Sequence, residues 1–106
     1  MIAYRKYHTR SAFGVASLTD AAWLEARLTP HPLGTYTSAL NFRDEPGNGL
    51  PAEYILCNDP IYGPLQGART RARSLGWPVR EIATGHDAMV TAPEALVDML
   101  EREPER

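Results

Sequence analysis

The chain has little of several things that would define its surroundings or its partners. A single cysteine, Cys57, cannot form an internal disulfide, which fits the reducing cytoplasm. No apolar run approaches the length of a membrane span, and the first residues contain no apolar signal-peptide core. Lysine and arginine number 11 against 13 aspartates and glutamates, so no basic excess favours nucleic acid. We therefore expect a cytoplasmic globular chain without a nucleic-acid or membrane partner.

Reactive groups are also few. Cys57 stands in an apolar run, where we expect a buried, inert thiol, because a nucleophilic cysteine needs an accessible, electropositive setting. His8 and His31 have no partner at the spacing of metal ligands, so we expect no metal site and no cofactor. No serine stands in a Gly-x-Ser-x-Gly sequence, the nucleophile elbow of many serine enzymes. The chain by itself therefore lacks a recognisable nucleophile.

The first part of the chain has only weak structural patterns. Residues 2–5 predict a short strand, and a helix follows with Thr19 as its N-cap and Trp23 on its apolar side. Pro30 is expected to end this helix, since proline cannot continue it. Residues 34–42 are rich in threonine and aromatic side chains and predict an extended segment.

A turn-rich loop at residues 43–51 divides the chain into two parts, residues 1–49 and residues 50–106. The sequence of the second part predicts regular α/β structure. Its expected elements are a strand at 54–57, a helix at 64–75, a strand at 79–83, and a helix that opens at a capping box, residues 91–94.

Both helices of the second part have an apolar stripe. The residues expected to be buried are Leu65, Ala68, Ala72 and Leu75 in one helix, and Leu96, Met99 and Leu100 in the other. Gly76 has the position of a glycine just past a helix end. The neighbouring arginines, Arg69, Arg71, Arg73 and Arg80, favour a solvated face over a phosphate site.

An acid and a histidine follow the two predicted strands. A strand–helix–strand unit with parallel strands places both strand ends at one edge of the sheet, where open α/β sheets build their active sites. Asp59 follows the first strand and His86 the second. These residue types can supply the carboxylate and the imidazole of a Ser–Asp–His triad, in that chain order. From the residues alone, the alternative is that Asp59 starts a turn before Pro60 and His86 caps a loop.

Two segments that surround these residues resemble a known family. Residues 50–62 and 76–96, which include Cys57-Asn-Asp59-Pro-Ile and Thr84-Gly-His86-Asp, are similar to the C-terminal end of α/β-hydrolase-fold proteins. The nearest group holds esterases and hydroxynitrile lyases. The resemblance implies that Asp59 is the triad acid and His86 the triad histidine. Residues 1–49 then resemble the end of a cap segment and its return to the core.

Three departures from that family affect the expected activity. The nucleophile elbow and the upstream oxyanion loop are missing. The loop that holds the acid is one residue shorter than in the plant members of the family. Hydroxynitrile lyases of this group have a lysine directly after the histidine, whereas this chain has Asp87. The resemblance therefore implies hydrolysis of a small-molecule ester by the parent enzyme.

Two hypotheses from different classes follow. In the first, the chain has a partial α/β-hydrolase fold and is the C-terminal part of a serine-type hydrolase, from a fragment or a truncated reading frame. In the second, it is a small non-catalytic α/β module that associates with a partner chain. A third, weaker hypothesis is a complete enzyme with unrelated chemistry at the same edge. An in-frame Gly-x-Ser-x-Gly segment in the upstream DNA would favour the first.

The expected sheet is too small to be closed. Parallel sheets are normally covered on both faces by helices, and two strands leave unpaired edges. The apolar strand at residues 54–57 lacks a neighbour on one side. We therefore expect self-association or binding to a complementary N-terminal half.

Overall fold

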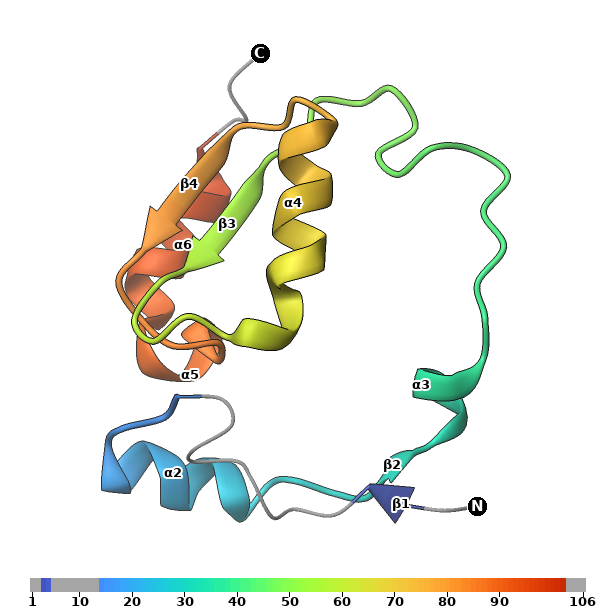
Figure 1. Cartoon of the computed structure of the whole chain (residues 1–106). Helices are drawn as coiled ribbons and strands as arrows, with labels where there is room; N and C mark the ends of the chain where they lie inside the picture. Colours follow the sequence, from blue (N-terminus) through green and yellow to red (C-terminus); the bar gives the residue numbers. More distant parts are fainter. Residues whose placement is uncertain (1–2, 5–13, 103–106) are drawn as a thin grey trace.

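A computed structural model describes residues 3–4 and 14–102. The elements, in chain order, are β1 (Ala3–Tyr4), α2 (Leu18–Glu25), β2 (His31–Pro32), α3 (Gly34–Thr37), β3 (Tyr54–Cys57), the 3₁₀ turn η1 (Gly63–Leu65), α4 (Gln66–Ser74), β4 (Val79–Ile82), α5 (Ala88–Thr91) and α6 (Pro93–Glu101). This mixture of helices and strands is compatible with the predicted α/β class (Figure 1).

The strands form two separate two-stranded sheets. β3 and β4 pair in parallel, from Tyr54 opposite Val79 to Cys57 opposite Ile82. η1 and α4 connect them, so the predicted strand–helix–strand unit is confirmed. β1 pairs with β2 antiparallel over two residues each. The strand predicted at residues 2–5 is therefore present at Ala3–Tyr4, and its two flanking residues lie outside the described part.

The turn between α4 and β4 forms as the sequence predicts. Gly76 has a φ of 75° and follows the last turn of α4. Its N–H donates to the Arg73 carbonyl oxygen, and the Trp77 N–H donates to the Ala72 carbonyl oxygen, each at 3.0 Å. This pair of bonds is a Schellman motif, in which a left-handed glycine satisfies the free carbonyls of a helix end. The motif turns the chain back toward β4.

Three predictions in the first part are wrong in detail. The N-cap of α2 is Ser17, whose side-chain oxygen accepts the Asp20 N–H at 3.2 Å, and not Thr19. Both are good capping residues, and the earlier one is used. The helix ends at Glu25, before Pro30 can stop it. The segment 34–42 is not extended throughout, because Gly34–Thr37 forms one helical turn.

The capping box predicted at residues 91–94 does not form. Thr91 is the last residue of α5, and α6 starts after Ala92 with no side-chain cap. The Thr91 hydroxyl instead hydrogen-bonds the hydroxyl of Thr84 and donates to the Asp87 carbonyl oxygen. Thr84 is 8% exposed and follows β4. A tertiary contact therefore occupies the side chain that the local pattern assigned to a cap.

The core between the sheet and its helices is small. Its buried apolar residues are Leu56 and Ile82 of the strands, Ala72 of α4 and Ala88 of α5. The predicted stripes are only partly buried: Ala68 is exposed, and Leu100 is 66% exposed. The strand Tyr54–Cys57 is likewise not buried throughout, since only Leu56 is buried and its other residues are half-buried.

The segment before α2 packs on the end of the sheet unit. Val15 is 1% exposed, and Ala21 of α2 is 4% exposed. Gly14 has a φ of 70°, and a Cβ atom there would lie 2.7 Å from Cδ of Pro60 and 3.5 Å from Cα of Gly85. These two neighbours follow β3 and β4 respectively, so the segment closes over the carboxyl end of both strands.

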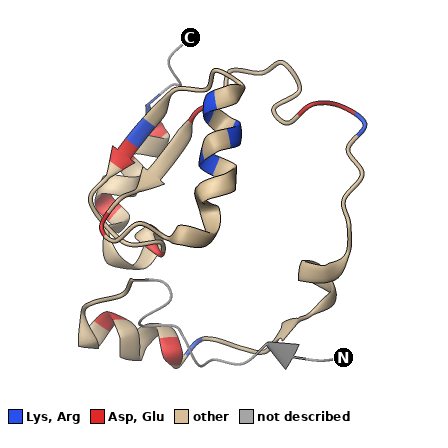
Figure 2. Ribbon diagram, viewed as in Figure 1, with Lys and Arg blue, Asp and Glu red and all other residues tan. Residues whose placement is uncertain are grey.

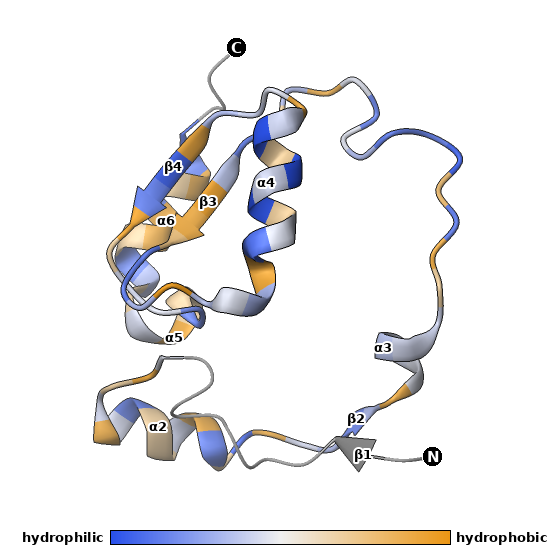
Figure 3. Cartoon of the chain, in the orientation of Figure 1, coloured by the Kyte–Doolittle hydropathy of each residue, from blue (hydrophilic) through white to orange (hydrophobic). Residues whose placement is uncertain are grey.

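Residues 33–50 form an arm that leaves this body. Every residue of the arm is exposed, and its apolar side chains include Leu40 at 77% and Phe42 at 72% (Figure 3). The Cα radius of gyration is 15.7 Å, against about 13 Å for a compact chain of this length. The projecting arm contributes to this excess (Figure 1).

Candidate functional site

The structure places the segments of both predicted site residues at one edge of the sheet. Asp59 lies in the turn after β3, and His86 lies in the loop after β4. The Asp59 N–H donates to the Thr84 carbonyl oxygen at 3.0 Å, which joins the two loops directly. The parallel pairing thus carries both segments to the carboxyl end of the strands.

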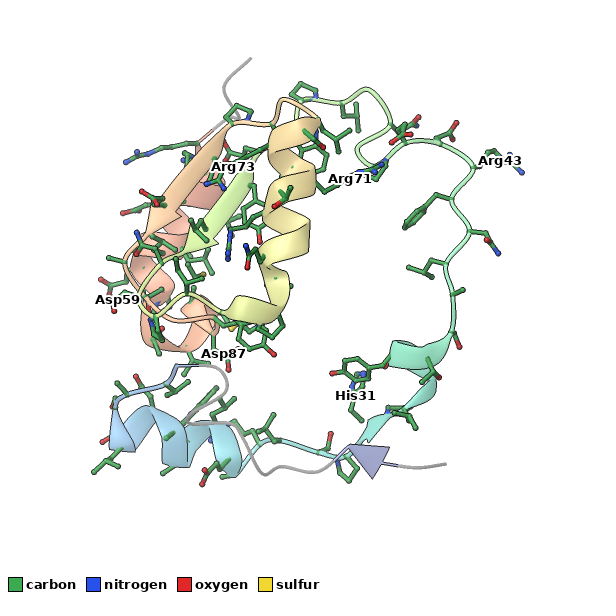
Figure 4. All side chains as sticks on the ribbon, viewed as in Figure 1. His31, Arg43, Asp59, Arg71, Arg73 and Asp87 are labelled. Carbon is green, nitrogen blue, oxygen red and sulfur yellow. The ribbon has the colours of Figure 1, made fainter. Side chains whose placement is uncertain are left out.

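The Asp59 carboxylate itself is not paired with the imidazole. Its side chain is exposed, and within residues 3–4 and 14–102 no hydrogen bond or ion pair joins it to His86. A different carboxylate, that of Asp87, interacts electrostatically with His86. Burial raises the pKa of Asp87, and the charge of His86 lowers it by a smaller amount. Asp59 and Asp87 lie at the same end of the sheet (Figure 4).

The imidazole of His86 is held by an aromatic neighbour. The rings of Tyr62 and His86 stack with centroids 4.2 Å apart and planes 20° apart. Both residues line a cavity of about 330 Å³ that runs along β3 to η1 and the first turn of α4. The other lining residues are Glu53, Tyr54, Ile55, Leu56, Cys57, Leu65 and Arg69. The histidine ring therefore has a fixed plane beside an open space.

Cys57 lines the same cavity, but its environment disfavours a thiolate. Burial, and secondly the negative charge of Asp87, raise the pKa of the Cys57 thiol. A nucleophilic cysteine needs the opposite shift. These physical causes support the expected inert thiol, but the expected full burial was wrong, because Cys57 is half-buried.

The titration of Cys57 provides a direct check. We expect the rate of iodoacetamide alkylation to rise with pH around a midpoint above that of an unfolded cysteine peptide, because the folded environment disfavours the thiolate. Asp87→Asn should move the midpoint down only in part, since burial is the larger cause. Mass spectrometry of timed reactions measures both. A midpoint at or below that of the peptide would contradict the assignment and indicate a reactive cysteine.

The four arginines that the sequence placed on a solvated face differ in their surroundings. Arg69 lines the cavity. Arg71 is exposed and forms an ion pair with Glu45 at 3.0 Å. Arg80 is largely buried and donates to Glu53 and, at 2.7 Å, to the Met99 carbonyl oxygen. Figure 2 shows the charged residues of α4 and β4. The expected solvated face therefore holds for Arg71 and Arg73, which are exposed, and is wrong for Arg80, which is largely buried.

Sequence reasoning missed Tyr62 and Arg69 as cavity residues and Asp87 as the charge that acts on His86. A signal was present for Asp87, which adjoins His86 in the sequence. A signal was also present for Arg69, which lies four residues after Leu65 and three before Ala72, on the side of the helix that carries the predicted apolar stripe. His31 lies in β2 and hydrogen-bonds the Thr35 hydroxyl at 2.7 Å.

The remaining features concern metals and membranes. Within the described ranges, no group of three or more histidine, cysteine, aspartate or glutamate side chains is placed to hold a metal ion. His8 lies outside those ranges. None of the helices that the structure describes is both long enough and apolar enough to cross a membrane.

Comparison with protein-family models, curated proteins and solved structures finds no match.

Proposed function

We propose that this chain is the C-terminal part of a serine-type α/β-hydrolase that acts on a small ester. Asp59 is the triad acid, and His86 is the imidazole that takes and returns the proton. The hydrogen bond from the Asp59 N–H to the Thr84 carbonyl oxygen supports this most directly. It keeps the acid-bearing and histidine-bearing loops together at the carboxyl end of a parallel pair, where open α/β sheets hold their reacting groups.

The surroundings of His86 suit the role of a general base. Stacking on Tyr62 restricts the plane of the ring, and the adjacent cavity leaves room for a nucleophile and a substrate acyl group. The exposed Asp59 side chain makes no hydrogen bond in the described ranges, so turning it toward His86 breaks none. We expect that rotation when the nucleophile-bearing part of the enzyme is in place. The serine and the oxyanion donors must come from outside these 106 residues.

The isolated chain is expected to show no esterase turnover above buffer on an activated ester such as p-nitrophenyl acetate. A histidine without a nucleophile acts only as a general base on water, which contributes roughly 10²–10⁴-fold. A fluorophosphonate probe should leave its mass unchanged. Saturable turnover that disappears in His86→Ala, or a phosphonylated serine, would show that these residues contain their own nucleophile.

A positive test uses the coding DNA before Met1. If an in-frame Gly-x-Ser-x-Gly segment is found, the longer reading frame should hydrolyse activated esters. His86→Ala and Asp59→Asn should each lower kcat by about 10⁴-fold, since each removes one member of a triad. Asp87→Asn is the matched control and should retain most of the activity. Loss in Asp87→Asn with retention in Asp59→Asn would transfer the acid role to Asp87.

A second candidate function is a non-catalytic module that associates with a partner chain. The unpaired edge of β3 favours it, because an exposed strand edge is a template for pairing. The two candidates differ in the longer reading frame: the module predicts no upstream nucleophile elbow and no ester hydrolysis.

A further inference from the structure

The edge of β3 that faces away from β4 has unused backbone groups. The Tyr54 N–H donates to the Pro78 carbonyl oxygen at 2.9 Å, and the Asn58 N–H donates to the Ile82 carbonyl oxygen at 3.0 Å. In a parallel ladder, alternate residues face the neighbouring strand, so Ile55 and Cys57 direct their N–H and C=O groups outward. In the part of the chain that the structure describes, no strand pairs there.

A cavity follows this edge. The space of about 330 Å³ is lined by residues 53–57 on one side and by Leu65 and Arg69 on the other. An added strand would find backbone partners at the edge and apolar surface beside it, which is how strand addition obtains affinity and specificity. Arg69 has no ion-pair partner within the described residues, so the cavity also favours a negatively charged neighbour.

The same chain contains an irregular segment whose backbone has no partner. Residues 39–44 make no backbone hydrogen bond in the described part of the chain. Leu40 and Phe42, two positions apart, are 77% and 72% exposed. Side chains at that spacing lie on one face of an extended strand. Asp44 comes two positions after Phe42, with Arg43 between them, and its negative charge is opposite to that of Arg69.

The arm contacts α4 on the side that faces away from the cavity, so it is not placed to reach the free β3 edge of its own chain. It is tied to the body by the ion pair between Glu45 and Arg71. Arg71 is two residues from Arg69, and about 3.6 residues per turn place positions two apart on nearly opposite sides of a helix. The arm therefore starts across α4 from the cavity that Arg69 lines.

We propose that the free edge of β3 binds residues 39–44 of a second copy of this chain, and that the two copies exchange arms around a two-fold axis. Each copy supplies one unpaired segment and one free β3 edge, so a reciprocal exchange covers both of these in a closed dimer. Leu40 and Phe42 enter the cavity, and Asp44 pairs with Arg69 of the other copy. Tyr62 and His86 line the same cavity, so an exchanged arm occupies the space that a substrate would need. The proposal therefore concerns the isolated chain, and its oligomeric state tests it separately from ester hydrolysis.

Sedimentation equilibrium of the full chain at several concentrations tests the dimer. Leu40→Ser and Phe42→Ser should each raise its dissociation constant by about tenfold or more, because each removes a buried apolar side chain from the interface. Leu100→Ser, at a residue of α6 that is 66% exposed, is the matched control and should leave it unchanged. A monomer at every concentration, or a dimer that tolerates both arm substitutions, would overturn the proposal.

Cross-linking distinguishes the occupants of the edge. A double variant with Leu40→Cys and Cys57→Ser is mixed with the natural chain, and a short bis-maleimide is added at alkaline pH, because the raised pKa of the Cys57 thiol slows its alkylation at neutral pH. A covalent dimer that contains one chain of each kind is expected. In Leu40→Cys alone, an intramolecular link would mean that the arm folds onto its own chain. A Cys57–Cys57 dimer of the natural chain would mean that two β3 edges pair with each other. Either result would exclude arm exchange.

Discussion

Replacing Arg80 with alanine is expected to lower the free energy of unfolding by about 3–5 kcal/mol, because it leaves a buried carboxylate without its partner. The Glu53 side chain is 11% exposed, and Arg80 is 21% exposed. The guanidinium group donates to Glu53 and, at 2.7 Å, to the Met99 carbonyl oxygen of α6. One side chain of β4 thus connects the start of β3 to the end of the last helix. Urea unfolding followed by circular dichroism measures the loss.

The rest of the chain provides a matched control. Arg71 and Glu45 form an ion pair at 3.0 Å with side chains 59% and 75% exposed. Exposed pairs contribute little, so Arg71→Ala should cost about 0–1 kcal/mol. The double variant Arg80→Met and Glu53→Gln should lose less free energy of unfolding than Arg80→Ala alone, because it leaves no buried charge without a partner. Equal losses for the Arg80 and Arg71 variants would contradict a buried ion pair.

Gly14→Ala is expected to destabilise the chain by about 2–4 kcal/mol, through left-handed backbone strain and steric overlap. The φ of Gly14 is 70°, and a Cβ atom would lie 2.7 Å from Cδ of Pro60. Relief requires the segment before α2 to move away from the turn after β3. Hydrogen exchange should accelerate in residues 15–25 more than in β3 and β4, and urea unfolding gives the total effect.

Gly34→Ala is the control for that experiment. Gly34 begins α3, its φ is not in the left-handed region, and no atom lies within 4 Å of its Cβ position. Alanine is favoured over glycine in a helix, so stability should stay the same or rise by up to about 1 kcal/mol. If Gly14→Ala behaves like Gly34→Ala, then the segment does not pack on the carboxyl end of the sheet.

Local patterns predicted the elements of the second part well, and their limits have identifiable causes. The apolar run at 54–57 and the glycine at 76 mark features that depend on near neighbours in sequence, and both occur as predicted. Capping was predicted less well. Ser17 and Thr19 are both good caps two positions apart, and a local rule cannot rank them. The Thr91 hydroxyl hydrogen-bonds the hydroxyl of Thr84, seven residues earlier, and does not cap α6. A capping rule considers only residues at the helix end, so it cannot include this contact.

The candidate site was likewise predicted from the sequence only in part. The sequence by itself determined that an acid and a histidine follow parallel strands, because strand order and strand direction place their segments at one edge. It also determined that the chain lacks a nucleophile elbow, which is a matter of residues alone. Only the tertiary structure decided the surroundings: Tyr62 stacks on the imidazole, and the cavity beside it is lined by Arg69 of α4. These contacts depend on side-chain directions and on packing between distant segments. Residue type and periodicity do not contain that information, so the placement of the two segments was predictable while the contacts of their side chains were not.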